Sequence, residues 1–194
     1  MDKMDGNASS DLVARWSVPL QDKIHRIEFE HGTTTGKRII RVDGKEVLRH
    51  DWMFKLVGKE AFTIGSMKCV IGVEALGTFA YEYSLEVNGK PFEKFREEQS
   101  KKLQSWETHI NGDDTRIVLD KDTMEVWVNG QKIDTAGEFV DDGTETHFEI
   151  GRHLCKIRSV SSGKKKVGVV HTFYVDGVPQ VCAEYGTDAG PSIN

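Results

Sequence analysis

"FTIGSMKCVI", Phe62 to Ile71, recurs later in the chain as "FEIGRHLCKI", Phe148 to Ile157, at an offset of 148 − 62 = 86 residues. The two stretches share the phenylalanine, the Ile-Gly pair, the cysteine and the final isoleucine. Three further matches keep the same chain order: Trp16 with Trp106 (106 − 16 = 90), "VDGK" at 42–45 with "VNGQ" at 128–131 (128 − 42 = 86), and "SLEVNG" at 84–89 with "TFYVDG" at 172–177 (172 − 84 = 88). Because chance would not supply four matches in order, the sequence predicts an internal duplication.

Both copies show the residue pattern of half-buried strands. Apolar side chains at Met67, Cys69, Ile71 and Val73 alternate with the residues between them, and the run from Phe79 to Val87 does the same. Such a period of two is typical of a strand with one buried face. Asn-Gly and Asp-Gly pairs, which favour tight hairpins, recur between the runs at 43–44, 88–89, 111–112, 129–130, 142–143 and 176–177. The pattern predicts an all-β protein of two tandem antiparallel β-sandwich domains.

The duplication also predicts the domain boundaries. We expect a flexible N-terminus over residues 1–11, an N-terminal β-sandwich over 12–93 and a C-terminal β-sandwich over 104–181. The charged stretch "EKFREEQSKKLQ" lacks alternation, so residues 94–103 are predicted to be a linker with a helical turn. Residues 182–194 are predicted to be a flexible tail.

Composition narrows the class of protein. With 31 acidic against 26 basic residues the net charge is −5, which argues against a nucleic-acid-binding protein. No apolar run is long enough to span a bilayer, and the first residues lack the apolar stretch of a signal peptide. Three widely spaced cysteines do not form a disulfide framework. We therefore expect a cytoplasmic protein without membrane insertion.

The acidic stretch "EFVDDGTETHFEIG", Glu138 to Gly151, is either a metal or substrate site or a polar turn. A metal site would use Asp141, Asp142, Glu145 and His147, but their spacing is not that of an EF-hand loop. The stretch also aligns with "WMFKLVGKEAFTIG", Trp52 to Gly65, in the first copy. We therefore expect a hairpin in both copies, and we predict no metal and no cofactor.

Two other groups of residues have a catalytic interpretation and a structural one. His171 lies in an alternating run and is expected to be a locally hydrogen-bonded histidine rather than a general base. His153 and Cys155 lie on the same face of a strand but too far apart for direct proton transfer. Cys69 and Cys155, at matching positions, are expected to be buried, and Cys182 to be the exposed thiol. The sequence supplies no convincing nucleophile and base, so no catalytic residue is predicted.

Several stretches together resemble the Fas apoptotic inhibitory molecule family from about Leu12 to Val181: "IEFEHGTTTGKRIIRVDGKEV", "WMFKLVGKEAF", "FAYEYSLEVNGK", "RIVLDKDTMEVWVNGQKI" and "TAGEFVDDGTETHFEIG". The resemblance implies tandem β-sandwiches in a cytoplasmic, non-enzymatic protein that inhibits apoptosis triggered by the Fas death receptor. It also implies a role in protecting cells under stress and in limiting protein aggregates.

Such a protein acts by binding other proteins, either apoptosis signalling components or aggregating clients. Trp127 matches Arg41 of the first copy and faces away from Val126 and Val128, so it is expected either to pack between the domains or to bind a partner. The candidate interaction residues are therefore Trp127, Asp141, Asp142 and Glu145. The alternative function is a ligand-binding β-sandwich module for carbohydrate or lipid, which requires a pocket in one sandwich.

Overall fold

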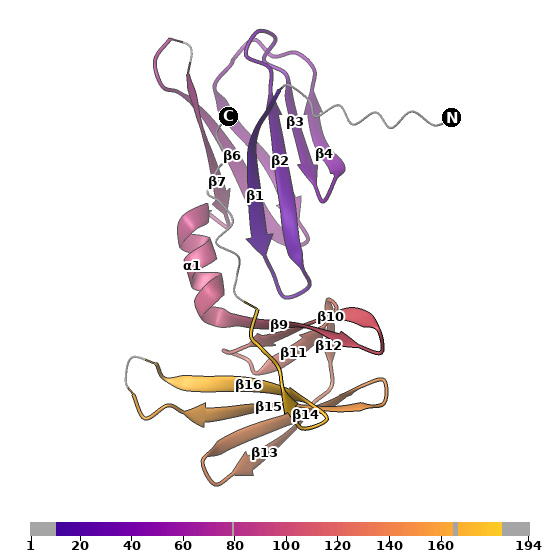
Figure 1. The fold of residues 1–194 in the computed structure, drawn as a ribbon. Helices are drawn as coiled ribbons and strands as arrows, with labels where there is room; N and C mark the ends of the chain where they lie inside the picture. The colour runs from indigo at the N-terminus through magenta and orange to yellow at the C-terminus, as the bar shows by residue number, and fades with distance from the viewer. Residues whose placement is uncertain (1–10, 79, 165–166, 184–194) are drawn as a thin grey trace, which may run out of the picture. The chain divides into compact units, whose positions relative to one another are not determined.

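The computed structural model describes residues 11–78, 80–164 and 167–183, and the structure is built almost wholly of antiparallel strands (Figure 1). It confirms the predicted all-β fold. Apart from Asp11, Cys182 and Ala183, the predicted N-terminal segment and tail lie outside the described residues, as does Phe79 in the second alternating run.

The first copy forms two antiparallel sheets. One has the order β1-β2-β3-β4, with β1 (Leu12–Pro19), β2 (Ile24–His31), β3 (Arg38–Val42) and β4 (Lys45–His50). The other has the order β5-β6-β7-β8, with β5 (Gly58–Ile64), β6 (Met67–Ala75), β7 (Tyr81–Val87) and β8 (Lys90–Pro91). The helix α1 (Phe92–Lys102) follows β8 directly.

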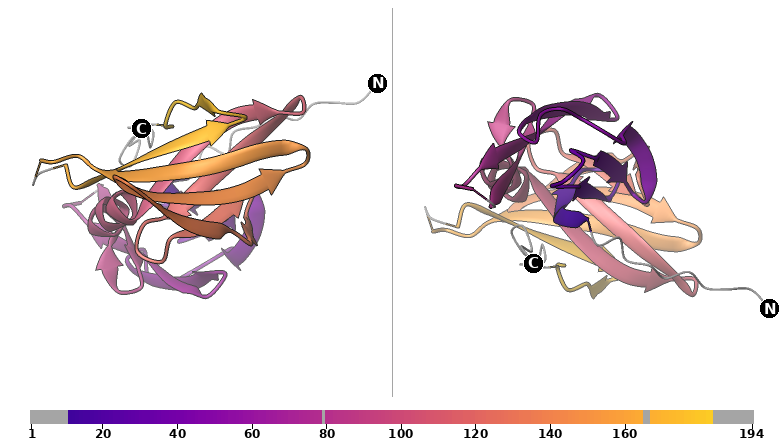
Figure 2. Two further views of the ribbon diagram at one scale, coloured as in Figure 1. Left: turned by 90° about the horizontal axis from the view of Figure 1, so that it is seen from below. Right: turned by 90° about the horizontal axis from the view of Figure 1, so that it is seen from above.

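The second copy repeats this arrangement with one additional strand. Its first sheet has the order β12-β11-β10-β9, with β9 (Leu103–Ile110), β10 (Asp113–Asp120), β11 (Glu125–Val128) and β12 (Gln131–Ile133). Its second sheet has the order β13-β14-β15-β16-β17, with β13 (Ala136–Val140), β14 (Gly143–Ile150), β15 (His153–Ser161), β16 (Val169–Val175) and β17 (Val178–Pro179). Figure 2 shows this second sheet, in orange and yellow, as one layer of the C-terminal sandwich.

The described chain divides into two compact units. One consists of the residues up to Leu20 together with Ile24–Glu98, and the other of Gln21–Lys23 together with the residues from Gln99 onward. The division therefore falls within α1, in the stretch predicted to be a linker.

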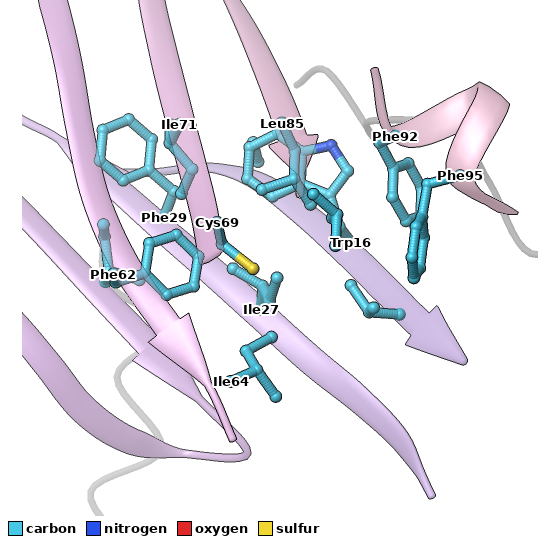
Figure 3. Packing of buried hydrophobic residues seen from close by; sticks show 14 of the residues in the cluster. Trp16, Ile27, Phe29, Phe62, Ile64, Cys69, Ile71, Leu85, Phe92 and Phe95 are labelled. Carbon is cyan, nitrogen blue, oxygen red and sulfur yellow. The ribbon is translucent and has the colours of Figure 1, made fainter. Parts of the chain in front are cut away.

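Each unit has its own hydrophobic core between its two sheets. In the first, Trp16, Ile27 and Phe29 of one sheet face Phe62, Cys69, Ile71 and Leu85 of the other, and Phe92 and Phe95 of α1 close the end (Figure 3). The second core holds the equivalent Trp106, Phe148, Cys155 and Ile157, with Phe173 stacked on Phe148 at 5.8 Å between ring centroids. Each fully buried large apolar side chain contributes roughly 1.5–3 kcal/mol, so these cores are the main source of stability. The core positions predicted for Trp16, Trp106, Cys69 and Cys155 are confirmed.

Asx-Gly turns connect many of the strands. Asp43, Asn88, Asn111, Asn129 and Asp176 all have positive φ angles, and each is followed by a glycine that also has positive φ. Tight hairpin turns need this backbone conformation, and Asn, Asp and Gly adopt it most readily.

The prediction of a hairpin before Gly65 in the first copy was wrong. In the second copy β13 pairs with β14, and the turn lies at 141–142 between Val140 and Gly143, as expected. In the first copy residues 51–57 form no strand, and within the described part of the chain β5 pairs with β6 alone. The reason is that other contacts hold this segment: the Met53 amide donates to the Thr35 carbonyl, and the Arg38 guanidinium donates to the Lys55 carbonyl.

Candidate interaction surfaces

Charged side chains gather on the outward face of the β13–β16 sheet. Strand pairing sets Glu145 opposite both Glu138 and Arg158, and His147 opposite Lys156. Because directly paired residues point to the same side of a sheet, these side chains share one face. We call this surface the charged face; it consists of Glu138, Asp142, Glu145, His147, Lys156 and Arg158.

Glu145 lies at the centre of the charged face and is buried by its neighbours. Both of its carboxylate oxygens accept hydrogen bonds from Lys156 Nζ, at 2.9 and 3.0 Å. The His147 imidazole Nε2 lies 3.3 Å from the same carboxylate and 3.5 Å from that of Glu138. Lys156 Nζ also lies 5.7 Å from the centre of the Tyr174 ring. Glu145 therefore organises this surface, and a partner would meet mainly the side chains around it.

The two aspartates of the β13–β14 turn differ in their contacts. Asp142 accepts two hydrogen bonds from the Arg158 guanidinium, at 2.7 and 3.0 Å. These bonds hold the pKa of the Asp142 carboxyl below its usual range. Asp141 is exposed and forms no ion pair with any residue that the structure describes. Of the two, Asp141 has the carboxylate more open to a partner.

Trp127 lies on a different sheet from these acidic residues. It is half-buried on β11, where it pairs with Val118 of β10 and Lys132 of β12. Its indole nitrogen is inaccessible to water and has no hydrogen-bond partner among the described residues. The structure thus brings Asp142 and Glu145 onto one face, with Asp141 beside them, but it does not add Trp127 to that face.

The structure also shows an exposed aromatic pair in the first unit that the sequence analysis did not select. We call residues 51–57 the aromatic loop. Trp52 is 64% exposed and Phe54 90% exposed, and their rings meet edge to face at 5.4 Å between centroids. The sequence signal is two aromatic residues, two apart, in "DWMFKLV", a stretch that the hairpin interpretation assigned to a strand.

Backbone contacts fix the aromatic loop on both sides of Phe54. The Met53 amide donates to the Thr35 carbonyl at 3.0 Å, and Arg38 Nη2 donates to the Lys55 carbonyl at 3.1 Å. Gly36 lies so close that a Cβ atom there would meet the Met53 carbonyl oxygen at 2.4 Å, the separation of a steric clash. The two aromatic side chains therefore project from a braced backbone.

The polar cluster around His153 has a structural role. His153 bonds to Asp176 at 2.6 Å and to Asn111 at 2.9 Å, which ties together the turns that carry these residues. The hydrogen bond from His153 lowers the pKa of Asp176. Within the described residues, no group of three or more histidine, cysteine and acidic side chains is placed to hold a metal ion.

Comparison with known proteins shows which family the chain resembles. A sequence profile of the Fas apoptotic inhibitory molecule family matches residues 12–181, which include both copies. The chain is 56% identical to Fas apoptotic inhibitory molecule 1 of Homo sapiens over 178 residues, covering 90% of this chain and 99% of the relative. It is 58% identical to the Mus musculus protein of the same name over 169 residues, covering 86% and 94%.

The chain belongs to the Fas apoptotic inhibitory molecule family. The resemblance inferred from the quoted stretches is thereby confirmed, with the matched range as expected. Over the part of the chain that the structure describes, no helix is both long and apolar enough to cross a membrane.

Proposed function

We propose that this protein inhibits Fas-triggered apoptosis in the cytoplasm by binding another protein, without catalysing a reaction. Its relatives are named for inhibition of Fas-dependent apoptosis, and the identity extends over nearly their whole length. The structural observation that carries the proposal is the aromatic loop.

The aromatic loop has the features of a binding hot spot. Tryptophan is enriched at the positions that contribute most to binding energy. Ordering flexible side chains and loops on association costs free energy, but here the backbone on both sides of Phe54 is already fixed. A partner that covers Trp52 and Phe54 would bury apolar area at a small ordering cost.

A double variant tests the aromatic loop. In cells that lack their own family member, the wild-type protein is expected to delay caspase activation after Fas stimulation, and Trp52→Ala/Phe54→Ala to lose most of that delay. Leu76→Ala is the matched control because Leu76 is also exposed, in the β6–β7 loop of the same unit. Full protection by the double variant at equal expression would exclude the loop as the binding surface.

The charged face with the neighbouring Asp141, and separately Trp127 on the other sheet, are the further candidate surfaces. Asp141→Lys reverses the charge at the exposed position 141 but leaves the Asp142–Arg158 pair in place. It should therefore weaken binding of a partner to this surface without disturbing the hairpin. Trp127→Phe tests the indole nitrogen separately. If Asp141→Lys or Trp127→Phe abolishes protection and the loop variant does not, binding belongs to the C-terminal unit instead.

We further propose that the protein limits aggregation of clients, because β13 offers an unpaired edge. Among the described strands β13 pairs only with β14, and Phe139 on it is 91% exposed. An edge strand can pair with an extended segment of another chain. Phe139→Lys is expected to weaken suppression of seeded fibre growth by excess protein, whereas Leu154→Lys, at another exposed apolar position, should not. Unchanged fibre growth with excess wild-type protein would refute this role.

A further inference from the structure

A cleft that several charged and hydroxyl side chains line opens between the two sheets at one end of the C-terminal unit. Its volume is about 590 Å³, within the range of small-molecule pockets. One wall comes from the β13–β17 sheet and contains Thr144, Ser159, Ser161 and His171. The facing wall contains Lys121 and Met124, from the turn between β10 and β11. We call this space the inter-sheet cleft.

The polar residues of the cleft lie on the face of the sheet that elsewhere forms the core. Thr144 pairs with Ser159, and Ser159 with His171, so the three form one row across β14, β15 and β16. The row two residues further toward the core consists of Thr146, Ile157 and Phe173 on the same face. Core-facing positions are usually apolar because burying polar groups costs free energy. We therefore infer that these polar side chains have a role other than packing the core.

The first copy provides an internal comparison. There the same strand pairing sets Gly58 opposite Val73, and Val73 opposite Tyr83. Tyr83 thus occupies the place of His171, and Val73 that of Ser159. One pair further along the strands, Ala75 faces Tyr81 where Ser161 faces Val169 in the second copy.

The residues of the facing wall also differ between the two copies. His31 of the first copy and Lys121 of the second are equivalent, because their amides donate to the carbonyls of Asp11 and Lys102, the residues just before β1 and β9. His31 is buried, bonds to the Tyr83 hydroxyl at 3.0 Å and meets the Tyr81 ring edge to face at 5.0 Å. Aromatic rings thus fill this end of the first unit. A hollow beside Gly58 and Val73 in that unit is smaller, about 380 Å³, and its lining is mainly apolar, with Val57 and Val73 among the residues.

The second copy has replaced this aromatic cluster with a cation and hydroxyl groups. Lys121 is half-buried and forms no ion pair within the described residues. The carboxylate of Asp142, at the rim of the cleft, accepts hydrogen bonds from the Arg158 guanidinium. Lys101 also lines the cleft. Burial, and next the charge of Lys121, lower the pKa of His171, so at neutral pH the ring is uncharged and bonds to the Ser159 hydroxyl at 2.8 Å.

We propose that the inter-sheet cleft binds a small organic phosphate monoester. Its phosphate group would lie at Lys121 and the hydroxyls of Thr144, Ser159 and Ser161, and its organic part against Met124 and Val169. A phosphate monoester carries about −1.5 to −2 charges at neutral pH. This charge balances the two lysines of the cleft, Lys101 and Lys121, better than the single negative charge of a carboxylate ligand would. The carbohydrate ligand of the alternative function fits less well, because no tryptophan, tyrosine or phenylalanine ring of the described residues lines the cleft, and a lipid fits less well because Lys101 and Lys121 both line it.

Titration of the isotope-labelled full chain with phenyl phosphate, followed by NMR at constant ionic strength, tests the site. Saturable shifts are expected at the amides of Gly143, Thr144, Ser159 and His171. Lys121→Gln should weaken binding by about tenfold or more, since hydrogen bonds to charged groups contribute about 1.5–3 kcal/mol. Lys59→Gln, beside the apolar hollow of the first unit, is the matched control and should leave the affinity unchanged.

A second variant closes the cleft with the residues of the first copy. His171→Tyr/Val169→Tyr is expected to abolish binding while the spectrum of the first unit stays the same. Because Tyr83 and Tyr81 occupy these positions in the first sandwich, the substitutions are compatible with the fold. Should Lys121→Gln fail to fold, Lys121→Arg keeps the charge and is expected to bind.

Three outcomes would overturn the proposal. The first is the absence of saturable shifts at the cleft with phenyl phosphate. The second is binding that survives both Lys121→Gln and the closing variant. The third is a preference for another ligand. Tighter binding of benzoate than of phenyl phosphate would show that the cleft recognises a carboxylate, and tighter binding of a phosphotyrosine peptide would show that its ligand is a protein.

Discussion

At the scale of single residues, Cys69 and Cys155 occupy one position of the duplicated fold and act as core side chains. Burial raises the pKa of both thiols to about 11. The thiolate is the reactive form of cysteine, so neither thiol has the environment of a nucleophile. Cys182, by contrast, is exposed.

Thiol labelling distinguishes these three side chains. In the native protein at neutral pH a disulfide reagent is expected to modify Cys182 quickly, and Cys69 and Cys155 only when their units unfold. Cys182→Ser should remove the fast phase entirely. A fast phase that persists in that variant would show that one of the two cores opens readily.

The ion pair of Arg38 and Glu60 lies buried in the first unit. Arg38 Nη1 lies 2.6 Å from the Glu60 carboxylate, and the Arg38 side chain is 1% exposed. The same guanidinium holds the Lys55 carbonyl of the aromatic loop. This arginine therefore connects β3, β5 and the loop.

Neutralising Glu60 should be costly because it leaves the buried Arg38 charge without its counter-ion. We expect Glu60→Gln to lower the free energy of unfolding of the first unit by about 3 kcal/mol, measured by urea denaturation. Glu46→Gln, which breaks the exposed pair with Arg49, should leave the midpoint unchanged. Equal effects of the two substitutions would mean that Arg38 is solvated in the folded protein.

At the scale of secondary-structure elements, the β13–β14 hairpin depends on a close approach at Gly143. A Cβ atom on Gly143 would meet the Ser159 carbonyl oxygen at 2.0 Å, whereas one on Gly137 in β13 would meet nothing within 4 Å. Two glycines of one hairpin thus differ only in their surroundings.

Alanine substitutions at the two glycines measure that difference. Gly143→Ala is expected to destabilise the C-terminal unit by about 1–3 kcal/mol, the usual cost of overpacking, with loss of amide protection in β13 and β14. Gly137→Ala should be close to neutral. If both variants unfold at the same denaturant concentration, β14 and β15 must be able to separate locally at no cost.

The sequence predicts strands and turns well because local rules decide them. The alternation around Cys69 and the Asx-Gly pairs specify half-buried strands and tight turns, and both copies carry them. The family's matched range agrees with the duplicated part of the chain.

Features that depend on distant contacts are not predictable in this way. The alignment of residues 52–65 with 138–151 predicts a hairpin in both copies, and no sequence pattern indicates that Arg38 and Thr35 hold the aromatic loop instead. The inter-sheet cleft arises from residues on β14, β15, β16 and the β10–β11 turn, which meet only after folding. His171 was expected to bond locally, and it does, but its position beside the cleft required the tertiary structure.

At the scale of the whole molecule, we propose that each half folds independently and that the first needs part of α1. Phe92 and Phe95 belong to the first core, with exposed fractions of 5% and 4%. The predicted domain boundary at residue 93 would remove Phe95.

Fragments test this boundary. A fragment of residues 11–98 should unfold cooperatively and be more stable than one of residues 11–93 by about 3–5 kcal/mol, the usual cost of losing a buried phenylalanine. Thermal or denaturant unfolding followed by circular dichroism would measure the difference. Identical stability of the two fragments would show that α1 contributes nothing to the first core.

Both units contain a histidine whose pKa burial lowers, His31 in the first and His171 in the second. Near the ordinary value of 6.5 the unfolded chain therefore binds more protons than the folded one, so stability rises with pH. The contribution is fully present above that value and is lost as the pH falls below it towards the lowered pKa values of the two histidines in the folded protein. Between about pH 7.5 and 5.5 the wild-type midpoint in urea should fall, and His31→Gln/His171→Gln should flatten that dependence. An unchanged slope in the double variant would assign the effect to other groups.

The Asn-Gly turns have a consequence for the chemical ageing of the chain. In a flexible chain the backbone nitrogen after asparagine attacks the side-chain amide, and glycine hinders that attack least. Here the side-chain oxygens of Asn88, Asn111 and Asn129 are engaged by Lys68 N, His153 Nε2 and Arg116 N. Deamidation at these turns should thus be slow while the hairpins persist and fast once they open. The extent of isoaspartate at the three sites would then record how long a molecule has spent unfolded.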